Sequence, residues 1–182
     1  VLQGTLLLPK SERPLPVALL IAGSGPTDRN GNNPAGHNDS LKRLAQGLAR
    51  QGVASLRYDK RGVGASLAAA ADERDLSVEA YVSDALAWSE RLKGDPRFGE
   101  LILVGHSEGA LIASLAAPRS GAAALISIAG SGRPIDAVLR EQLLDIATDL
   151  FAHQGIHATS LRDAPDDLMA HLGTLDGLIT TV

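Results

Sequence analysis

The chain has 182 residues, of which 45% are hydrophobic and 21% are charged, so it is long enough for one globular domain with its own core. Its net charge of −4 provides no basic surface for nucleic acid or an anionic membrane, and the absence of cysteine excludes disulfides and thiolate metal sites. No apolar run is long enough to cross a membrane.

The first third of the chain combines apolar runs with one amphipathic segment. Residues 1–9 favour an outer strand that stops at a proline, residues 17–22 favour a buried strand, and residues 53–58 favour a third strand. A polar loop over residues 27–38 is of a length that is uncommon unless functional, and Asp39 or Ser40 could cap the helix after it. The apolar positions of that helix follow the 3.6-residue period and Gly52 ends it: Leu41, Leu44, Ala45 and Leu48.

The middle of the chain repeats the alternation of strand and helix. Residues 65–75 are alanine-rich and charged without a clear period, and we expect a surface loop there, followed by a helix that Ser77 could cap. The remaining elements are a buried strand over 101–104, a helix over 108–117 that residues 118–121 break, and a buried strand over 123–129. This order predicts an α/β fold, with a mainly parallel sheet and helices on both faces. Ligands of such sheets bind outside the carboxyl ends of the strands.

One junction between strand and helix carries a chemical signature. Gly105-x-Ser107-x-Gly109 joins a buried strand to a helix with almost no loop between them, which is the nucleophile-elbow pattern. Side chains two positions either side of the central residue would collide with neighbouring backbone, so glycine is expected there. The hydroxyl of Ser107 would then stand at the carboxyl edge of the sheet, with the helix N-terminus beneath it.

The pattern of the chain changes after residue 132. Residues 135–151 and 161–172 have helical spacing, and no strand-like run appears before Leu178. We therefore predict an α/β core over residues 1–132 and a helical lid or cap segment over residues 133–182. The lid has no sign of being a separately folding domain.

With this junction placed, the chain resembles the α/β-hydrolase superfamily, in particular bacterial carboxylesterases and serine-aminopeptidase-like hydrolases. Three motifs carry the resemblance, in the family's order and spacing: residues 23–32 (GSGPTDRNGN), 56–66 (LRYDKRGVGAS) and 105–109 (GHSEG). The resemblance implies that Ser107 is the nucleophile, in an elbow formed with Gly105, His106 and Gly109. It also implies that the backbone N–H groups of Ser24 and Glu108 form the oxyanion hole.

The same resemblance implies a catalytic acid and a histidine after the nucleophile. Nothing beyond residue 129 reads as a strand ending on an acid followed by a strand ending on a histidine. We therefore expect both groups to lie beyond residue 182, which makes the α/β fold incomplete at its C-terminal side. The alternative is an unfamiliar topology in which His153, His157 or His171 of the lid is the base. His37 precedes the nucleophile, and His106 is expected to point away from its hydroxyl.

Other residue patterns favour structural roles. The segment from Asp28 to Asp39 imitates a calcium loop without its glycine and final glutamate, and we expect a loop ordered by Asx turns. No phosphate loop or dinucleotide fingerprint is present, so we expect neither metal nor cofactor. Asp59 is expected to accept backbone hydrogen bonds that hold the loops at the edge of the sheet. Tyr81 and Trp88 are expected to face the core.

Three functions remain open at this point. The leading one is hydrolysis of small carboxylic esters through an acyl-enzyme on Ser107. The second is an aminopeptidase or amidase, with Asp166 or Asp167 of the lid holding a substrate ammonium group. The third is a non-catalytic binding protein, if the chain ends at Val182. The expected partner is a small-molecule ester, without nucleic acid or a membrane span; oligomeric state is left open, as is a cytoplasmic location or export with removal of a leader.

Overall fold

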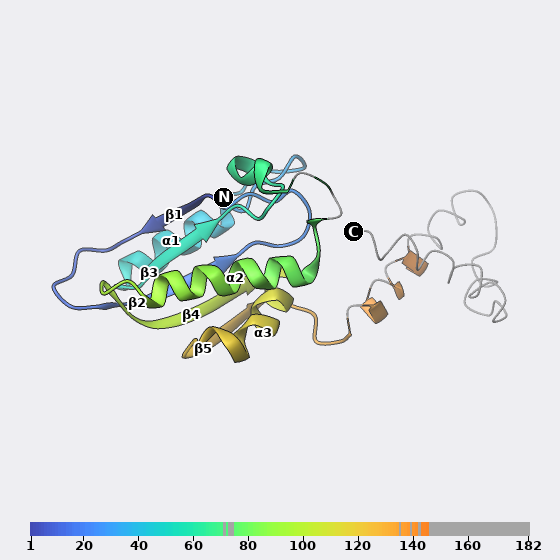
Figure 1. Cartoon of the computed structure of the whole chain (residues 1–182). Helices are drawn as coiled ribbons and strands as arrows, with labels where there is room; N and C mark the ends of the chain where they lie inside the picture. The colour runs from blue at the N-terminus through green and yellow to red at the C-terminus, as the bar shows by residue number, and fades with distance from the viewer. Residues whose placement is uncertain (71, 73–74, 135, 139, 142, 146–182) are drawn as a thin grey trace. The chain divides into compact units, whose positions relative to one another are not determined.

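The protein is described by a computed structural model that covers residues 1–70, 72, 75–134, 136–138, 140–141 and 143–145. Its elements follow the order strand, strand, helix, and then alternate (Figure 1). They are β1 (Gly4–Leu7), β2 (Leu15–Ile21), α1 (Ser40–Arg50), β3 (Ala54–Tyr58), the 3-10 helix η1 (Gly64–Ala69), α2 (Val78–Lys93), β4 (Phe98–His106), α3 (Glu108–Ser120) and β5 (Ala124–Ile128).

The strands form one mainly parallel sheet in the order β1-β3-β2-β4-β5. Among the described strands, only β1 runs antiparallel to its neighbour, β3, and it lies at the edge of the sheet as predicted. The central strands β2 and β4 pair in parallel, with Ile21 opposite Gly105. Because parallel strands end at the same edge, the loops after β2, β3 and β4 leave the sheet side by side.

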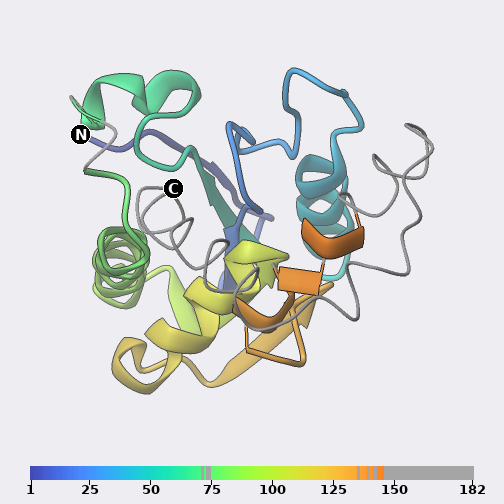
Figure 2. The same cartoon turned by 90° about the vertical axis from the view of Figure 1, so that its right-hand side faces the viewer.

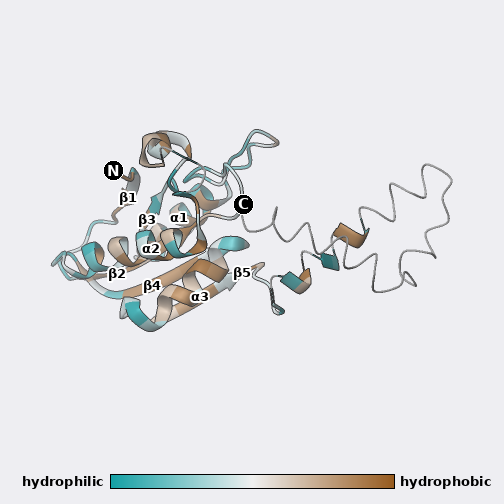
Figure 3. Ribbon diagram, turned by 45° about the vertical axis from the view of Figure 1, so that its right-hand side comes forward, coloured by the Kyte–Doolittle hydropathy of each residue, from teal (hydrophilic) through white to brown (hydrophobic). Residues whose placement is uncertain are grey.

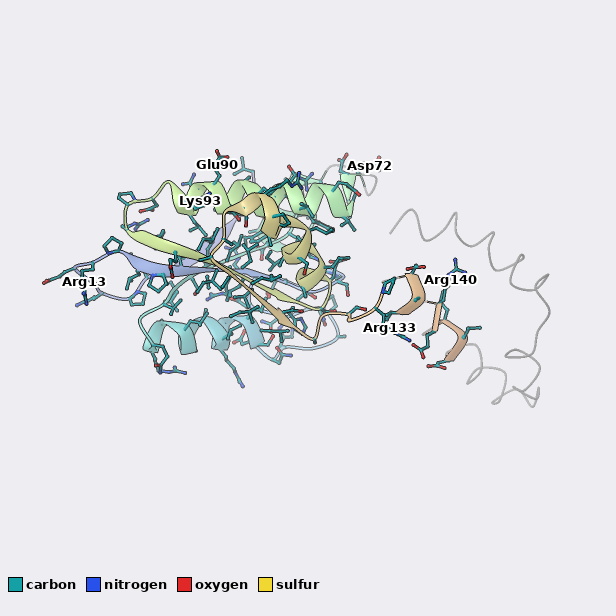
Figure 4. All side chains as sticks on the ribbon, turned by 90° about the horizontal axis from the view of Figure 1, so that it is seen from below. Arg13, Asp72, Glu90, Lys93, Arg133 and Arg140 are labelled. Carbon is teal, nitrogen blue, oxygen red and sulfur yellow. The ribbon has the colours of Figure 1, made fainter. Side chains whose placement is uncertain are left out.

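Helices cover both faces of the sheet. Helix α1 lies on one face, and α2 and α3 lie on the other, which Figures 2 and 4 show from two directions. Successive side chains of β2 point to opposite faces of the sheet and so contribute to the apolar core on each face. Leu19 packs toward α2 and α3, whereas Leu20 packs toward α1. Figure 3 shows the apolar character of β4 and of much of α3, the elements that end and begin at the predicted nucleophile.

Of three predicted helix ends, the start of α2 is confirmed, whereas the start of α1 and the end of α3 follow the prediction only in part. Ser77 caps α2, accepting a hydrogen bond from the amide of Ala80 at 3.1 Å. Asp39 occupies the cap position of α1, but its carboxylate makes no cap hydrogen bond and binds Asn32 and Lys42 instead. The predicted break at residues 118–121 was placed too early, because Pro118 lies inside α3 and the left-handed Gly121 ends it.

The structure corrects two further expectations. The predicted surface loop over residues 65–75 contains η1, which is anchored because Ser66 is buried and accepts the amide of Gln3 at 2.8 Å. Strand β5 was predicted to be buried, yet all five of its residues are exposed. The cause is its place at the edge of the sheet, where β4 is its one neighbour among the described strands.

The chain separates into two compact units, residues 1–130 and residues 131–182. In the second unit, the described residues include helical positions at 136–138, 140–141 and 143–145, and Arg133 forms an ion pair with Glu141. The greater part of the predicted lid lies outside the described residues. No helix in the described ranges has the length and apolar character needed to cross a bilayer.

Candidate active site

Ser107 lies at an abrupt turn between β4 and α3. Its backbone has φ 54° and ψ −118°, a region that residues with a side chain rarely adopt and that stores strain at functional sites. Two hydrogen bonds hold it there: its amide donates to the carbonyl of Ile128 at 2.9 Å, and its own carbonyl accepts the amide of Ala110 at 2.9 Å. The turn therefore depends on both the neighbouring strand β5 and the first turn of α3.

The glycines beside Ser107 are required by close backbone approach. A Cβ on Gly105 would lie 2.1 Å from the carbonyl oxygen of Gly109, and a Cβ on Gly109 would lie 2.2 Å from the carbonyl oxygen of Ile21. Both separations are well below ordinary contact, and in both cases the obstacle is backbone, which cannot rotate away. These close approaches support the expectation that both positions require glycine. The approach at Gly109 shows in addition that the start of α3 lies against the backbone of β2.

The loop after β2 lies directly against Ser107. A Cβ on Gly23 would be 3.3 Å from the Cβ of Ser107 and 3.1 Å from Nδ1 of His106. The next amide along, that of Ser24, has no hydrogen-bond acceptor within the described part of the chain, and neither has the amide of Glu108. The latter is one of the unpaired donors that every helix leaves at its N-terminus. Neither of the two predicted oxyanion donors is therefore occupied by an acceptor from the described part of the chain.

A buried lysine, which the sequence argument missed, connects these two segments. Nζ of Lys60 lies 2.6 Å from the carbonyl oxygen of Gly23 and 2.6 Å from Oε2 of Glu108. Its side chain is buried and its ammonium lies 5.0 Å from the centre of the Tyr81 ring. The motif at 56–66 contains Lys60, but no spacing signal links it to residues 37 and 48 positions away.

Asp59 holds the loops of the edge together, as predicted. Its carboxylate accepts the amide of Arg29 at 2.7 Å, the guanidinium of Arg29 at 2.7 Å and the amide of Ala65 at 2.9 Å. Burial alone would raise the pKa of Asp59, but the hydrogen bonds from Arg29 and Ala65 outweigh it and hold the pKa below its ordinary value. Its oxygens are occupied by the protein, which is typical of a structural carboxylate.

The long polar loop is also held by its own side chains. Oδ1 of Asp28 accepts the amides of Asn30 and Asn32, and Oδ1 of Asn32 accepts the amides of Asn38 and Asp39. The bond from the amide of Asn30 to Asp28 is an Asx turn of the kind that the sequence predicts, as are those from Ala35 to Asn33 and from Ser40 to Asn38; the bonds to Asn32 span six and seven residues and close the loop over a longer distance. No group of three or more possible metal ligands occurs among the residues that the structure describes.

Within the described ranges, the hydroxyl of Ser107 forms no hydrogen bond to a histidine or a carboxylate. His37 and His106 are both exposed. The alternative bases His153, His157 and His171 lie outside the described residues, as do Asp166 and Asp167. The predicted roles of Ser107, Ser24 and Glu108 remain predictions, now attached to a defined geometry.

Comparison with known proteins shows the family to which the sequence of this chain belongs. The chain matches the family model described as serine aminopeptidase, S33, over residues 35–164. It is 35% identical over 143 residues to esterase EstD of Thermotoga maritima, a match covering 78% of this chain and 33% of EstD. The chain therefore spans about a third of the length of this curated relative.

Solved structures agree with the fold. XC6422 from Xanthomonas campestris, an α/β serine hydrolase without a lid, is 26% identical with a TM-score of 0.55, covering 73% of this chain and 58% of that protein. Est1E from Butyrivibrio proteoclasticus, with ferulic acid bound, is 25% identical with a TM-score of 0.53, covering 68% and 47%. Because the family match extends over well more than half of its residues, this chain belongs to the serine aminopeptidase S33 family of the α/β-hydrolase superfamily.

Proposed function

We propose that this chain carries the nucleophile and the oxyanion hole of a serine hydrolase that cleaves small carboxylic esters. The observation that carries the proposal is the strained turn at Ser107, with two unpaired amides beside it. A hydroxyl held at such a turn stands at the carboxyl edge of a parallel sheet, where ligands of α/β proteins bind. The name of one similar protein, esterase EstD, favours an ester as substrate, and the ferulic acid bound to Est1E is a carboxylic acid, the class of product that ester hydrolysis releases.

In the proposed reaction, Oγ of Ser107 attacks the ester carbonyl while its proton passes to a histidine outside the described residues. The carbonyl oxygen becomes an oxyanion, which the amides of Ser24 and Glu108 stabilise, each donor contributing about 10²–10³ in rate. The alcohol leaves with the proton from the histidine, and an acyl group remains on Ser107. Water, deprotonated by the same histidine, then releases the carboxylic acid.

The test is the Ser107→Ala substitution, assayed on a nitrophenyl ester with the protein in its full length. We expect turnover to be lost while the far-UV circular dichroism stays unchanged. Ser83→Ala is the matched control, because Ser83 is exposed on α2 and has no role in the proposed reaction. Wild-type activity in Ser107→Ala would overturn the assignment. In the active protein, kcat/KM should rise with pH through about 6–7, as the histidine becomes neutral.

A second candidate is an aminopeptidase or amidase, favoured by the description of the matched family model. It requires the same nucleophile and oxyanion hole, and additionally a carboxylate for the substrate ammonium group. A direct comparison of kcat/KM on a nitrophenyl ester and on an amino-acyl anilide separates the two. A fluorophosphonate that fails to label Ser107 would instead favour a non-catalytic relative.

A further inference from the structure

Lys60 carries a buried charge at the point where three segments of the fold meet. Its ammonium is buried at the end of β3, between the loop after β2 and the start of α3. An ammonium has three protons to donate, and two of them have partners here, the carbonyl oxygen of Gly23 and Oε2 of Glu108, both at 2.6 Å. Burying such a charge is unfavourable unless it is paired, so both contacts are expected to be strong and persistent.

The first contact controls the direction of a predicted oxyanion donor. The carbonyl oxygen of Gly23 and the N–H of Ser24 are two ends of the same peptide group. That peptide is trans, since the described residues contain no cis bond, and its C=O and N–H therefore point in opposite directions. When Lys60 holds the oxygen, the N–H of Ser24 is fixed facing away from Lys60. The positive charge also polarises the peptide and strengthens its N–H as a donor.

The second contact acts on the other donor. Glu108 is the first residue of α3, and its amide is the second predicted oxyanion donor. Its carboxylate is partly exposed and would repel a negative charge forming beside Ser107. The ammonium of Lys60 neutralises that carboxylate and ties the first residue of the helix to the loop after β2.

Taking both contacts together, we infer that Lys60 is a positioning residue for the oxyanion hole: it orients the peptide between Gly23 and Ser24 and neutralises Glu108, without touching the substrate. This inference rests on the proposed function. It requires that loss of Lys60 weaken transition-state stabilisation more than substrate binding, which a purely structural ion pair would not do.

The experiment compares Lys60→Met with Lys42→Met, its matched control. Lys42 also forms an ion pair, with Asp39, but at the half-exposed start of α1. Active sites are titrated with a fluorophosphonate, so that kcat is expressed per reactive Ser107. A boronic acid, whose tetrahedral adduct carries the oxyanion, is measured against a product alcohol that binds without one.

We expect Lys60→Met to lower kcat per titrated site by about 10²–10³, the effect of losing one donor, with KM changed less than threefold. The boronic acid should lose affinity by the same factor and the alcohol should lose none. Lys42→Met should match the wild type in all four measurements. A lower fraction of titratable sites with a normal kcat per site would overturn the inference and make Lys60 merely structural.

The double variant Lys60→Met with Glu108→Gln decides the matter if Lys60→Met does not fold, because it leaves neither charge without its partner. It removes the carboxylate that would repel the oxyanion, so the remaining effect comes from the lost hold on the carbonyl oxygen of Gly23. We expect kcat per titrated site and boronic acid affinity to fall together by about tenfold. Unchanged values would overturn the inference. An active Ser107→Ala variant would overturn the proposed function itself, which is a different outcome.

Discussion

Gly109→Ala tests the close approach of α3 to β2, on which the position of Ser107 depends. The added Cβ would lie 2.2 Å from the carbonyl oxygen of Ile21 and 2.6 Å from that of Ala22, where real Cβ contacts essentially never fall below 3.0 Å. The start of α3 must therefore move away from β2. Such overpacking destabilises by about 1–3 kcal/mol, and the better helix propensity of alanine, about 1 kcal/mol, offsets part of it. Because both obstacles are backbone oxygens far inside contact distance, the upper part of the overpacking range applies, and we expect a net loss of about 1–2 kcal/mol in the free energy of unfolding.

Gly47→Ala provides the same chemical change with the opposite expected sign. Gly47 lies inside α1, and the nearest atom to an added Cβ is a flexible guanidinium nitrogen of Arg50 at 3.9 Å. Here helix propensity acts without a clash, so stability should rise by about 0.5–1 kcal/mol. Urea unfolding followed by the fluorescence of Trp88, the single tryptophan, measures both. A Gly109→Ala midpoint equal to or above that of the wild type would refute the close approach.

Two further substitutions test buried polar groups. Asp59→Asn should lower stability at neutral pH by about 1–3 kcal/mol, because an amide cannot accept all the hydrogen bonds from Arg29 and Ala65. The folded state lowers the pKa of Asp59, so the ionised carboxylate contributes its full stabilisation above a pH of about 4 and loses it as the pH falls further. The free energy of unfolding of Asp59→Asn should therefore fall less between neutral and acid pH than that of the wild type. An equal fall in both proteins would contradict this. Tyr58 Oη is buried without a partner in the described ranges, so Tyr58→Phe should keep or raise stability by up to about 1 kcal/mol; a loss above 1 kcal/mol in urea unfolding would contradict this.

The sheet and the turn at Ser107 could be predicted because their signals are local. Leu101 to Val104 are apolar in a row, and Gly105 and Gly109 stand two residues either side of Ser107, so spacing alone indicates a strand, a tight turn and a helix. The exposure of β5 could not be predicted in this way. Its apolar sequence is typical of a buried strand, whereas its burial depends on which strands lie beside it.

Lys60 shows the same limit at the site itself. A lysine in a turn after a strand ordinarily lies in solvent, and nothing in residues 56–66 indicates that this one is buried. Its burial follows from three separate segments meeting at one edge: the end of β3, the loop after β2 and the start of α3. The spacing of residues within one segment does not indicate which other segments will pack against it.

The pairing of β2 with β4 determines where these segments meet. Ile21 lies opposite Gly105, so both strands leave the sheet at the same level, and the residues after them, Gly23 and Ser107, come into contact. Moving β2 by two residues along β4 would preserve the faces of the sheet but displace the loop by about 6.6 Å. The carbonyl of Gly23 would then be out of reach of Lys60, and Gly109 would no longer face Ile21. The close approach at Gly109 therefore selects this register as well as the turn, which couples the stability of the central strand pair to the geometry around Ser107.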